Sequence, residues 1–415
     1  MFSIRRIGIW GRKRQDSDHG AVATLLAAIL AGGVVFGLGA VVIDIGQLYV
    51  EREQLQSGAD AASMAVALSC IRGDVCTKEN QVGKAILYAK KNAGGDQQAD
   101  AMVCISNTSC PSPWNTTVTC PPLPAVPAGQ SVGQYAEVRT STVTSTGSTL
   151  LPPTFAGALT GGAYTGKKVG TCARVSWGPP VTTKVFALGI SLCDWKRMTG
   201  NGTVYYGPIG GLLSGLGLYT TIGLPNPTTG ADYSIVKSGS TVLLGSVIPS
   251  CTTPLDTTVP RGYGWLMYQD LTAPDSSCMM NIAVDDLPRA SVLALTALTC
   301  VPLLQAYAAA GKAIMVPIYD KLVPSFSPIL SIAPQYHIVG FAPFVPTGYY
   351  TLLGGLVKGL GSILSGGLTQ GLNDVLCIVS ACITGYFTKT LVPLSRPTGF
   401  GTGQNFGATV IARTG

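Results

Sequence analysis

The sequence predicts an α+β protein in which a long N-terminal helix packs on a mostly antiparallel β head, and a second β-rich unit follows. Three observations predict this class. Residues 21–43 contain no charged side chain, and a helical pattern continues beyond them. The remainder, with most of the 52 Gly and 27 Pro, alternates short Val- and Thr-rich runs with turn residues, as strands joined by turns do. A helix and a sheet that are each apolar on one face bury those faces against one another.

A basic tail, residues 1–20, comes first and holds Arg5, Arg6, Arg12, Lys13 and Arg14. Residues 21–43 then extend about 34 Å as a helix, which is enough to cross the hydrocarbon core of a bilayer. Because basic flanks stay on the cytoplasmic side, we expect a single-pass protein of the cytoplasmic membrane, with its N-terminus inside and the bulk of the chain extracytoplasmic. A cleaved signal peptide is the alternative, although its apolar run is shorter, about 7–15 residues.

Residues 44–69 continue the helix as an amphipathic segment. Apolar side chains recur there at spacings of three and four, which places them on one helix face. That face has two candidate partners, the protein's own head and other subunits. Asp44 stands at the outer end of the apolar run, and we interpret it as an interfacial residue rather than a buried functional charge. The candidate contact stripe consists of Ile45, Leu48, Leu55, Ala59, Ala62 and Val66.

Twelve cysteines all follow residue 69, on the predicted extracytoplasmic side. Their even number indicates an oxidising compartment and disulfide bonding throughout. No C-x-x-C spacing occurs and the chain has two histidines, so we predict no metal site. Connectivity does not follow from the sequence, although Cys70–Cys76 and Cys377–Cys382 are candidate local pairs. The disulfide candidates are Cys70, Cys76, Cys104, Cys110, Cys120, Cys172, Cys193, Cys251, Cys278, Cys300, Cys377 and Cys382.

The predicted extracytoplasmic head covers residues 70–184. Residues 105–135 are rich in Ser, Thr, Pro and Asn, which is typical of a surface loop, and nearby cysteines are placed to tie it down. The Val- and Thr-rich runs 136–144 and 168–177 predict two strands, paired through the connection at 145–165.

Residues 185–415 form the second predicted unit, which is disulfide-bonded and β-rich. Residues 286–310 have a helical pattern that Pro302 weakens. Two Gly/Leu-rich stretches, 208–225 and 352–372, are interpreted as apolar loops or weak helices, either packed in the head or exposed as contact surfaces. A second membrane span is the alternative for the latter stretch. The clearest strand predictions are 241–248, 313–320 and 337–345.

No catalytic constellation stands out, and we predict that the protein is not an enzyme. The run 161–168 has the spacing of a phosphate-binding loop, but Lys168 stands where the Mg²⁺-binding hydroxyl belongs, so we interpret the run as a glycine-rich turn. His337 is the only histidine outside the basic tail, and we interpret it as structural. No catalytic, cofactor-binding or metal-binding residue is therefore predicted.

Charge argues against a nucleic-acid partner. The formal net charge of +7 is modest, and part of it lies in the basic tail. No basic stripe interleaved with aromatic side chains occurs elsewhere, so nucleic-acid binding is not expected. Charged residues make up 11% of the chain and hydrophobic residues 47%, which excludes disorder driven by high charge.

Four local features give the N-terminal region a specific pattern: Gly20-Ala21-Val22, Asp44-x-Gly46, Leu55-Gln56 and Ala59-Asp60-Ala61-Ala62. With these features the region resembles TadE/TadG-like proteins of the actinobacterial type, a family associated with assembly of the Flp (tight-adherence) pilus. Shorter pieces further along, such as residues 138–161 and 336–350, look like the same family.

The resemblance implies a pilin-like, membrane-anchored extracytoplasmic protein with a structural or assembly role in the Flp pilus or a related cell-surface adhesion system. It implies no cofactor. The implied partners are the membrane, pilus-assembly or pilin-like membrane proteins, and a second copy of the chain in a homo-oligomer. Leu25 stands where prepilins have Glu, which argues against prepilin-peptidase cleavage. The D-x-S-x-S metal motif of some TadG proteins is missing, with Asp275-Ser276-Ser277 as the nearest run.

Two other functions stay open at this point. One is an extracytoplasmic ligand-binding or adhesin module without a pilus role. The other is an anchored hydrolase, for which the sequence shows no catalytic constellation.

Overall fold

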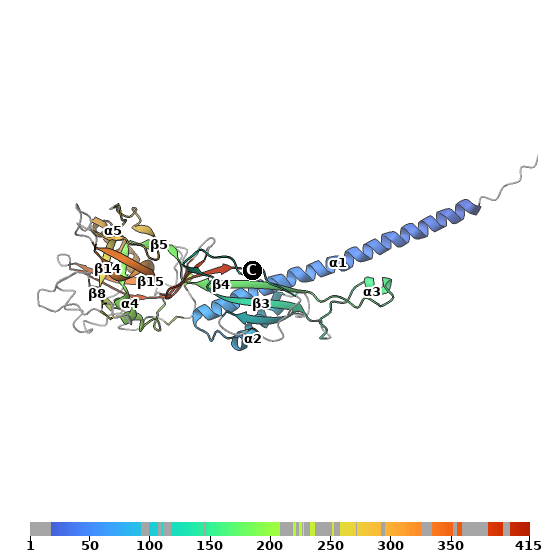
Figure 1. Ribbon diagram of the computed structural model, residues 1–415, viewed down its shortest axis with the longest axis horizontal. Helices are drawn as coiled ribbons and strands as arrows, with labels where there is room; N and C mark the ends of the chain where they lie inside the picture. The colour runs from blue at the N-terminus through green and yellow to red at the C-terminus, as the bar shows by residue number, and fades with distance from the viewer. Residues whose placement is uncertain are drawn as a thin grey trace, which may run out of the picture.

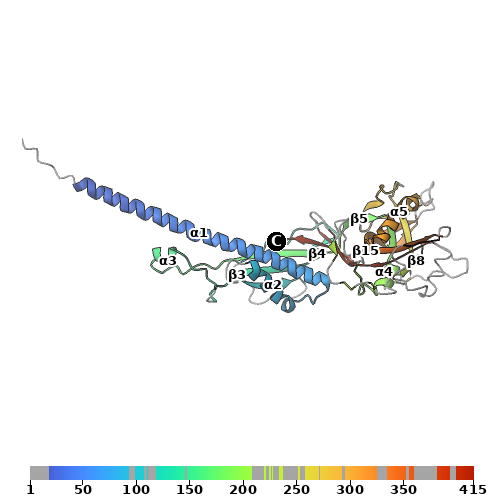
Figure 2. The ribbon, with the colours of Figure 1, turned by 180° about the vertical axis from the view of Figure 1, so that it is seen from behind.

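Helix α1 (Asp18–Arg72) projects from one end of the molecule, and the strands gather toward the other (Figure 1). The view from behind has the same arrangement (Figure 2). The structure therefore contains the long apolar helix and the mixture of helices and sheets that the sequence predicts. This computed structural model describes residues 18–92, 99–106, 110, 118–144, 147–207, 219–220, 224–225, 227, 233–236, 251–252, 258–270, 272–291, 295–324, 334–351, 355–358, 381–392 and 399–415.

Helix α1 runs without a break for 55 residues, slightly beyond the predicted 21–69 at both ends. Of the helices in the described ranges, it is the one long and apolar enough to cross a membrane. Described large apolar side chains of its N-terminal half, among them Leu25, Leu30 and Val35, are exposed. At its C-terminal end, Gly73 has a φ of +103° and its N–H donates to the carbonyl oxygen of Cys70. A glycine in this left-handed region is a common helix terminator.

The C-terminal half of α1 packs on α2 (Lys78–Asn92) and on the first sheet. This sheet has the order β1–β3–β4–β20–β18–β7. Strands β3 and β4 pair antiparallel, which confirms the two strands predicted at 136–144 and 168–177. The strand bounds are β1 Ala99–Ile105, β3 Gln134–Thr142, β4 Gly170–Gly178, β7 Tyr219–Thr220, β18 Thr390–Val392 and β20 Ala408–Arg413.

The end of the chain completes this first sheet. Strand β20 pairs antiparallel with β4, and β18 lies parallel to β20. The carbonyl oxygen of Gly415 accepts a hydrogen bond from the backbone N–H of Arg174 at 2.6 Å. A short pair, β2 (Gln130–Ser131) with β19 (Phe400–Gly401), adds a second link. Strands from both predicted regions, 70–184 and 185–415, therefore share one sheet, and the boundary between the regions stays a prediction.

The second sheet has the order β13–β11–β6–β14–β15–β17–β8, with β16 paired to β15. Its long central pair, β14 and β15, confirms the strands predicted at 313–320 and 337–345. The strand predicted at 241–248 lies outside the described residues. The bounds are β6 Leu188–Ser191, β8 Tyr233–Val236, β11 Tyr263–Met267, β13 Arg289–Ala290, β14 Ile314–Val323, β15 Gln335–Thr351, β16 Gly355–Lys358 and β17 Cys382–Phe387.

Two helices lie on opposite sides of β14 and β15 (Figures 1 and 2). Helix α4 (Leu192–Thr199) contacts β14, β17 and β6, and α5 (Leu295–Ala309) contacts β15 and β11. Helix α5 begins nine residues later than the predicted 286–310 and keeps Pro302 within it. Residues 289–290 instead form β13 and pair with β11. The remaining elements are α3 (Ala156–Leu159) and the pairs β5 (Thr182–Phe186) with β12 (Met279–Ala283) and β9 (Cys251–Thr252) with β10 (Thr258–Val259).

Disulfides stabilise both halves of the structure. The predicted local pair Cys70–Cys76 is confirmed and closes the turn after α1. Cys104–Cys110 and Cys120–Cys172 tie the loop after β1 to the first sheet, and Cys278–Cys300 joins the end of the loop before β12 to α5. Cys193 and Cys382 are disulfide-bonded as well. In the predicted pair Cys377–Cys382, Cys377 lies outside the described part of the chain. Most of the Gly/Leu-rich stretches 208–225 and 352–372 also lies outside it.

Candidate functional site

Helix α1 has two environments along its length. Between Val22 and Ile43 the large apolar side chains that the structure describes are exposed, with Leu30 at 65%. From Leu55 to Ser69 one side of the helix is buried against the head, and Leu55 is only 1% exposed. Uncharged, exposed apolar surface of this extent marks a contact with lipid or protein. One continuous helix therefore joins an apolar projection to the core of the head.

The six residues of the predicted contact stripe fall in both environments. Ile45 is 46% exposed, and Leu48 is half-buried beside the core of the head. Leu55, Ala59, Ala62 and Val66 are buried; the last four thus lie against the protein's own head. Contact of these four residues with another subunit would require the head to separate from α1.

Polar contacts add to the packing of α1 on the first sheet. The Thr140 hydroxyl of β3 donates to the backbone carbonyl of Leu55 at 3.0 Å, and the Thr142 hydroxyl donates to Glu51 at 2.9 Å. The Gln56 side-chain amide donates to the backbone carbonyl of Cys172 on β4 at 3.2 Å. These bonds satisfy polar groups that the packing would otherwise leave unpaired, so they orient the helix on the sheet.

Helices α1 and α2 approach each other closely at Gly58. A Cβ atom at this position would lie 3.1 Å from the carbonyl oxygen of Ala89 on α2. The small side chains of Ala62, Ala85 and Ala89 belong to the buried cluster in this region. The decrease in side-chain size along the helix therefore permits α2 to pack close to the backbone of α1.

Asp44 makes contacts that an interfacial position does not account for. It was interpreted as interfacial, but it is 9% exposed and its carboxylate accepts the backbone N–H groups of Thr154, Phe155 and Ala156, at distances from 2.5 to 3.2 Å. Burial opposes its charge, but these three hydrogen bonds outweigh burial and lower the pKa of Asp44. The position predicted to face the interface instead holds a distant segment of the chain, which no local pattern in the sequence indicates.

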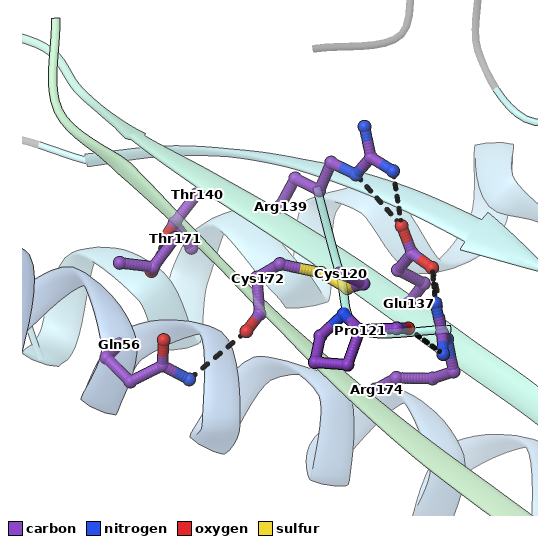
Figure 3. Close-up of a disulfide and its surroundings, with 9 residues drawn as sticks. All are labelled: Gln56, Cys120, Pro121, Glu137, Arg139, Thr140, Thr171, Cys172 and Arg174. Atoms are coloured by element: carbon purple, nitrogen blue, oxygen red, sulfur yellow. Dashed lines mark hydrogen bonds and ion pairs between the residues drawn. A yellow bond between two sulfur atoms is a disulfide. The ribbon is translucent and has the colours of Figure 1, made fainter. Parts of the chain in front are cut away.

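A buried ionic cluster lies beside the disulfide Cys120–Cys172 (Figure 3). The Glu137 carboxylate of β3 lies between two guanidinium groups, with Arg139 at 2.8 Å and Arg174 at 2.6 Å. Arg174 also donates to the carbonyl oxygen of Pro121 at 2.8 Å. Because both arginines and the glutamate are largely buried, the mutual pairing offsets the cost of taking the charges out of water. The cluster ties the 118–129 loop, β3 and β4 together beside α1.

Among the described residues, this cluster also contains the one group of three metal-ligand residue types whose ligand atoms all lie near one another. The ligand atoms of Cys120, Cys172 and Glu137 are within 4.8 Å of one another. The two sulfur atoms are joined in a disulfide, and metals bind the thiolate form of cysteine. The donor set is therefore a structural disulfide beside an ion pair.

His337 lies on β15 with carboxylates at both ring nitrogens. Its Nδ1 is 2.7 Å from Asp320 and its Nε2 is 3.5 Å from Asp285. Asp320 lies on the paired strand β14, and Asp285 lies in the turn after β12. The imidazole therefore bridges the second sheet and the turn that follows β12.

One catalytic spacing was overlooked in the sequence, the G-x-S-x-G run at residues 129–133. In hydrolases this run forms a sharp turn from a strand into a helix, with the serine exposed at its apex. Here Ser131 lies in the two-residue strand β2, and its Oγ accepts the N–H of Gly133 at 3.1 Å. The run therefore forms a strand end paired with β19 and not a nucleophile elbow.

Comparison with known proteins gives one match, and it falls on α1. Residues 20–69 match the model of the Tad family, the TadE/G-like Flp pilus-assembly proteins. No curated protein matches the chain significantly. No solved structure matches it significantly. The matched residues cover both the exposed apolar part of α1 and the part buried in the head, so the similarity to the TadE/G-like Flp pilus-assembly family is shown for residues 20–69.

Proposed function

We propose that this protein is a membrane-anchored, extracytoplasmic structural or assembly component of the Flp (tight-adherence) pilus or of a related cell-surface adhesion system. The observation that carries the proposal is the family match on residues 20–69. These residues include an uncharged apolar stretch long enough to span a bilayer and the segment that packs into the head. The basic tail before this stretch favours an N-terminus in the cytoplasm and a head outside.

The proposed mechanism is rigid presentation of the head, as in pilin-like proteins. Leu55 and Val66 are buried in the head's core, and the disulfide Cys70–Cys76 closes the turn after the helix. A helix that belongs both to the membrane anchor and to the head core transmits position and force between them without a flexible linker. Disulfides persist in an oxidising extracytoplasmic compartment, where they keep the head's surface fixed.

The exposed half of α1 is the proposed contact with pilus-assembly membrane proteins or with a second copy. Gly33 and Gly37 lie one turn apart, and a Cβ atom added at either position would meet nothing within 4 Å. Small residues at this spacing let transmembrane helices approach closely. The apolar residues around them, such as Leu30 and Val34, are exposed, so this face is available to another helix within the membrane.

The proposal is for a protein without catalytic activity. It is supported by His337, whose two ring nitrogens each lie beside a carboxylate instead of being aimed at a nucleophile in the described part of the chain. It is also supported by Ser131, which lies in a strand pair and not at an exposed elbow.

Co-purification tests the assembly role. The full chain is tagged in the basic tail, because the C-terminal Gly415 is bonded to Arg174 within the sheet. After extraction from its native membranes with mild detergent, we expect pilus-assembly membrane proteins in the eluate. Gly33→Leu with Gly37→Leu is expected to reduce their recovery, and Gly39→Leu, equally open, is the matched control. Absence of such proteins from the unmodified sample would contradict the proposal.

Protease added to intact cells stripped of their wall tests the topology. We expect digestion of the head and protection of a fragment that contains the basic tail and residues 21–43. Protection of the whole chain, with digestion only after lysis, would place the head inside and contradict the proposal.

A cleft favours a second candidate function, an extracytoplasmic binding module. The cleft has a volume of about 640 Å³ and lies where the first sheet meets the second half of the chain, with Trp177, Tyr205, Lys389 and Asn405 among its lining residues. Lys389 lies 4.9 Å from the centre of the Tyr205 ring, and burial lowers the pKa of Lys389. A soluble ligand whose binding is lost in Lys389→Met, while co-purification of pilus-assembly proteins is unchanged, would establish this second function.

A further inference from the structure

A hairpin that we call the arm, residues 150–168, projects from the first sheet between β3 and β4 (Figures 1 and 2). Its two legs are joined by reciprocal backbone hydrogen bonds between Leu151 and Lys167, at 3.0 and 3.2 Å. Gly166 has a φ of +124°, and a Cβ atom there would collide with the backbone of Leu151. The tip contains α3 and the glycines Gly161 and Gly162, which begin the run that resembles a phosphate-binding loop in sequence. The arm is thus an ordered hairpin with a turn at its tip.

The arm is fixed to α1 at the point where the exposed apolar segment of the helix ends. Asp44 directly follows this segment and binds three backbone N–H groups of the tip. One turn later, Gln47 accepts a hydrogen bond from the Thr154 hydroxyl at 2.7 Å. One turn earlier on the same face, Ala40 is also buried, and α3 contacts α1. The tip therefore lies at the level of the last turns of the apolar segment and not above it.

The composition of the arm suits the boundary between lipid and water. Residues 140–166 contain no charged side chain, and Lys167 and Lys168 follow directly. Phe155 at the tip is 44% exposed, and both lysines are exposed. Phenylalanine occurs on the apolar face of segments that lie in the membrane interface, and exposed lysines near the surface are attracted to anionic lipid headgroups.

We propose that the arm is a second membrane contact, in which the tip enters the outer interfacial layer of the bilayer with Phe155 as its apolar anchor, while Lys167 and Lys168 face lipid phosphates. This inference rests on the proposed function, in which α1 spans the membrane and the head lies outside. The partner is the lipid of the outer leaflet, because the tip continues the exposed apolar surface of α1 and carries no charge for a specific protein contact.

Two points of contact with the membrane restrict the orientation of the protein more than one point does. A single helix can tilt and rotate in the bilayer, because its own packing does not fix either angle. With the arm held to α1 by Asp44, contact of the tip with the headgroup layer limits rotation about the helix axis. The head is then presented to its partners in one orientation relative to the membrane.

Fluorescence quenching by brominated lipid tests the contact. The full chain is reconstituted in vesicles of phosphatidylcholine and phosphatidylglycerol, with acyl chains brominated or unbrominated, and a tryptophan is introduced at one position at a time. Phe155→Trp reports on the arm, Leu30→Trp on the apolar part of α1, and Val75→Trp on an exposed apolar position at the opposite end of α1. Emission is taken as the difference from the unmodified chain, which has five tryptophans of its own.

We expect brominated lipid to abolish most of the added emission at positions 155 and 30 and to leave that at position 75 unchanged. Quenching at 30 without quenching at 155 would overturn the arm proposal and leave the anchor standing, including the case in which a protein covers the tip. Absence of quenching at 30 would overturn the proposed membrane anchor itself. Adding Asp44→Asn to Phe155→Trp is expected to reduce quenching at 155, and unchanged quenching would refute the role of Asp44 in placing the tip.

Discussion

Replacement of Leu55 by alanine tests whether α1 is part of the core of the head. Leu55 is 1% exposed and belongs to a cluster formed by α1, α2 and the first sheet. A buried Leu→Ala change costs about 2–5 kcal/mol, depending on how far the site can collapse around the lost atoms. Here collapse is restricted, because the Leu55 carbonyl is bonded to Thr140 and β3 is held between β1 and β4. We therefore expect a loss of about 3–5 kcal/mol from the free energy of unfolding.

Urea unfolding of the purified full chain in detergent, without reductant, measures this loss as a shift of the transition midpoint. Hydrogen exchange of the β3 and β4 amides is followed in parallel, and we expect it to accelerate in Leu55→Ala. Leu30→Ala is the matched control, the same change on the same helix at a side chain that is 65% exposed. Its expected effect on the head is within about 0.5 kcal/mol. Equal midpoints for the two variants would refute the view that α1 is integral to the head, and would favour a stripe that is free to pack on other subunits.

Three further predictions concern contacts between distant segments. Asp194 is fully buried and paired with Arg261 at 3.2 Å. Because Asp194→Ala leaves an unpaired charge behind, we expect it to lower the free energy of unfolding in urea by about 3–5 kcal/mol. A loss of free energy no larger than that of a surface substitution would contradict this. The pKa of Asp44 is lowered from 3.8, so its contribution to docking of the arm is complete above pH 3.8 and is lost as the pH falls through its lower folded value. Cleavage of the arm by pepsin, followed across the acid range, would detect this loss of docking. In Asp44→Asn we expect the pH dependence of docking to disappear. Cys120→Ser with Cys172→Ser opens a link with a sequence separation of 52 and is expected to lower the free energy of unfolding by about 4 kcal/mol, and an unchanged urea midpoint would show that the ion pairs beside it are sufficient.

Local patterns predicted much of the framework. The uncharged run 21–43 and the spacing of apolar residues after it predicted one continuous helix, since helical periodicity is a property of the local sequence. The β3–β4 pair followed from two Val- and Thr-rich runs that are close in sequence. The Cys70–Cys76 pair was accessible for the same reason, because a short separation leaves few alternative partners.

The contacts that form the candidate site could not be predicted from local sequence patterns. Asp44 binds residues 154–156, and Arg174 binds Gly415, so both contacts join segments that are far apart in the chain. The uncharged composition of the arm was visible, but its place beside α1 was not. An acidic residue at the end of a membrane helix has the same local surroundings whether it faces lipid headgroups or a docked hairpin.

The sequence by itself determined which segment is able to cross a membrane, the helix that continues from it, the disulfide bonding of the cysteines and the family similarity of residues 20–69. Each of these is a property of composition or of short spacing. Only the tertiary structure decided that the stripe from Leu55 to Val66 is covered by the protein's own head, that β20 returns to complete the first sheet and that the arm docks on Asp44. These features depend on the path of the whole chain, because burial and strand pairing are set by which distant segments meet. The contacts that stabilise them join residues that are far apart in the sequence, so no local pattern predicts them.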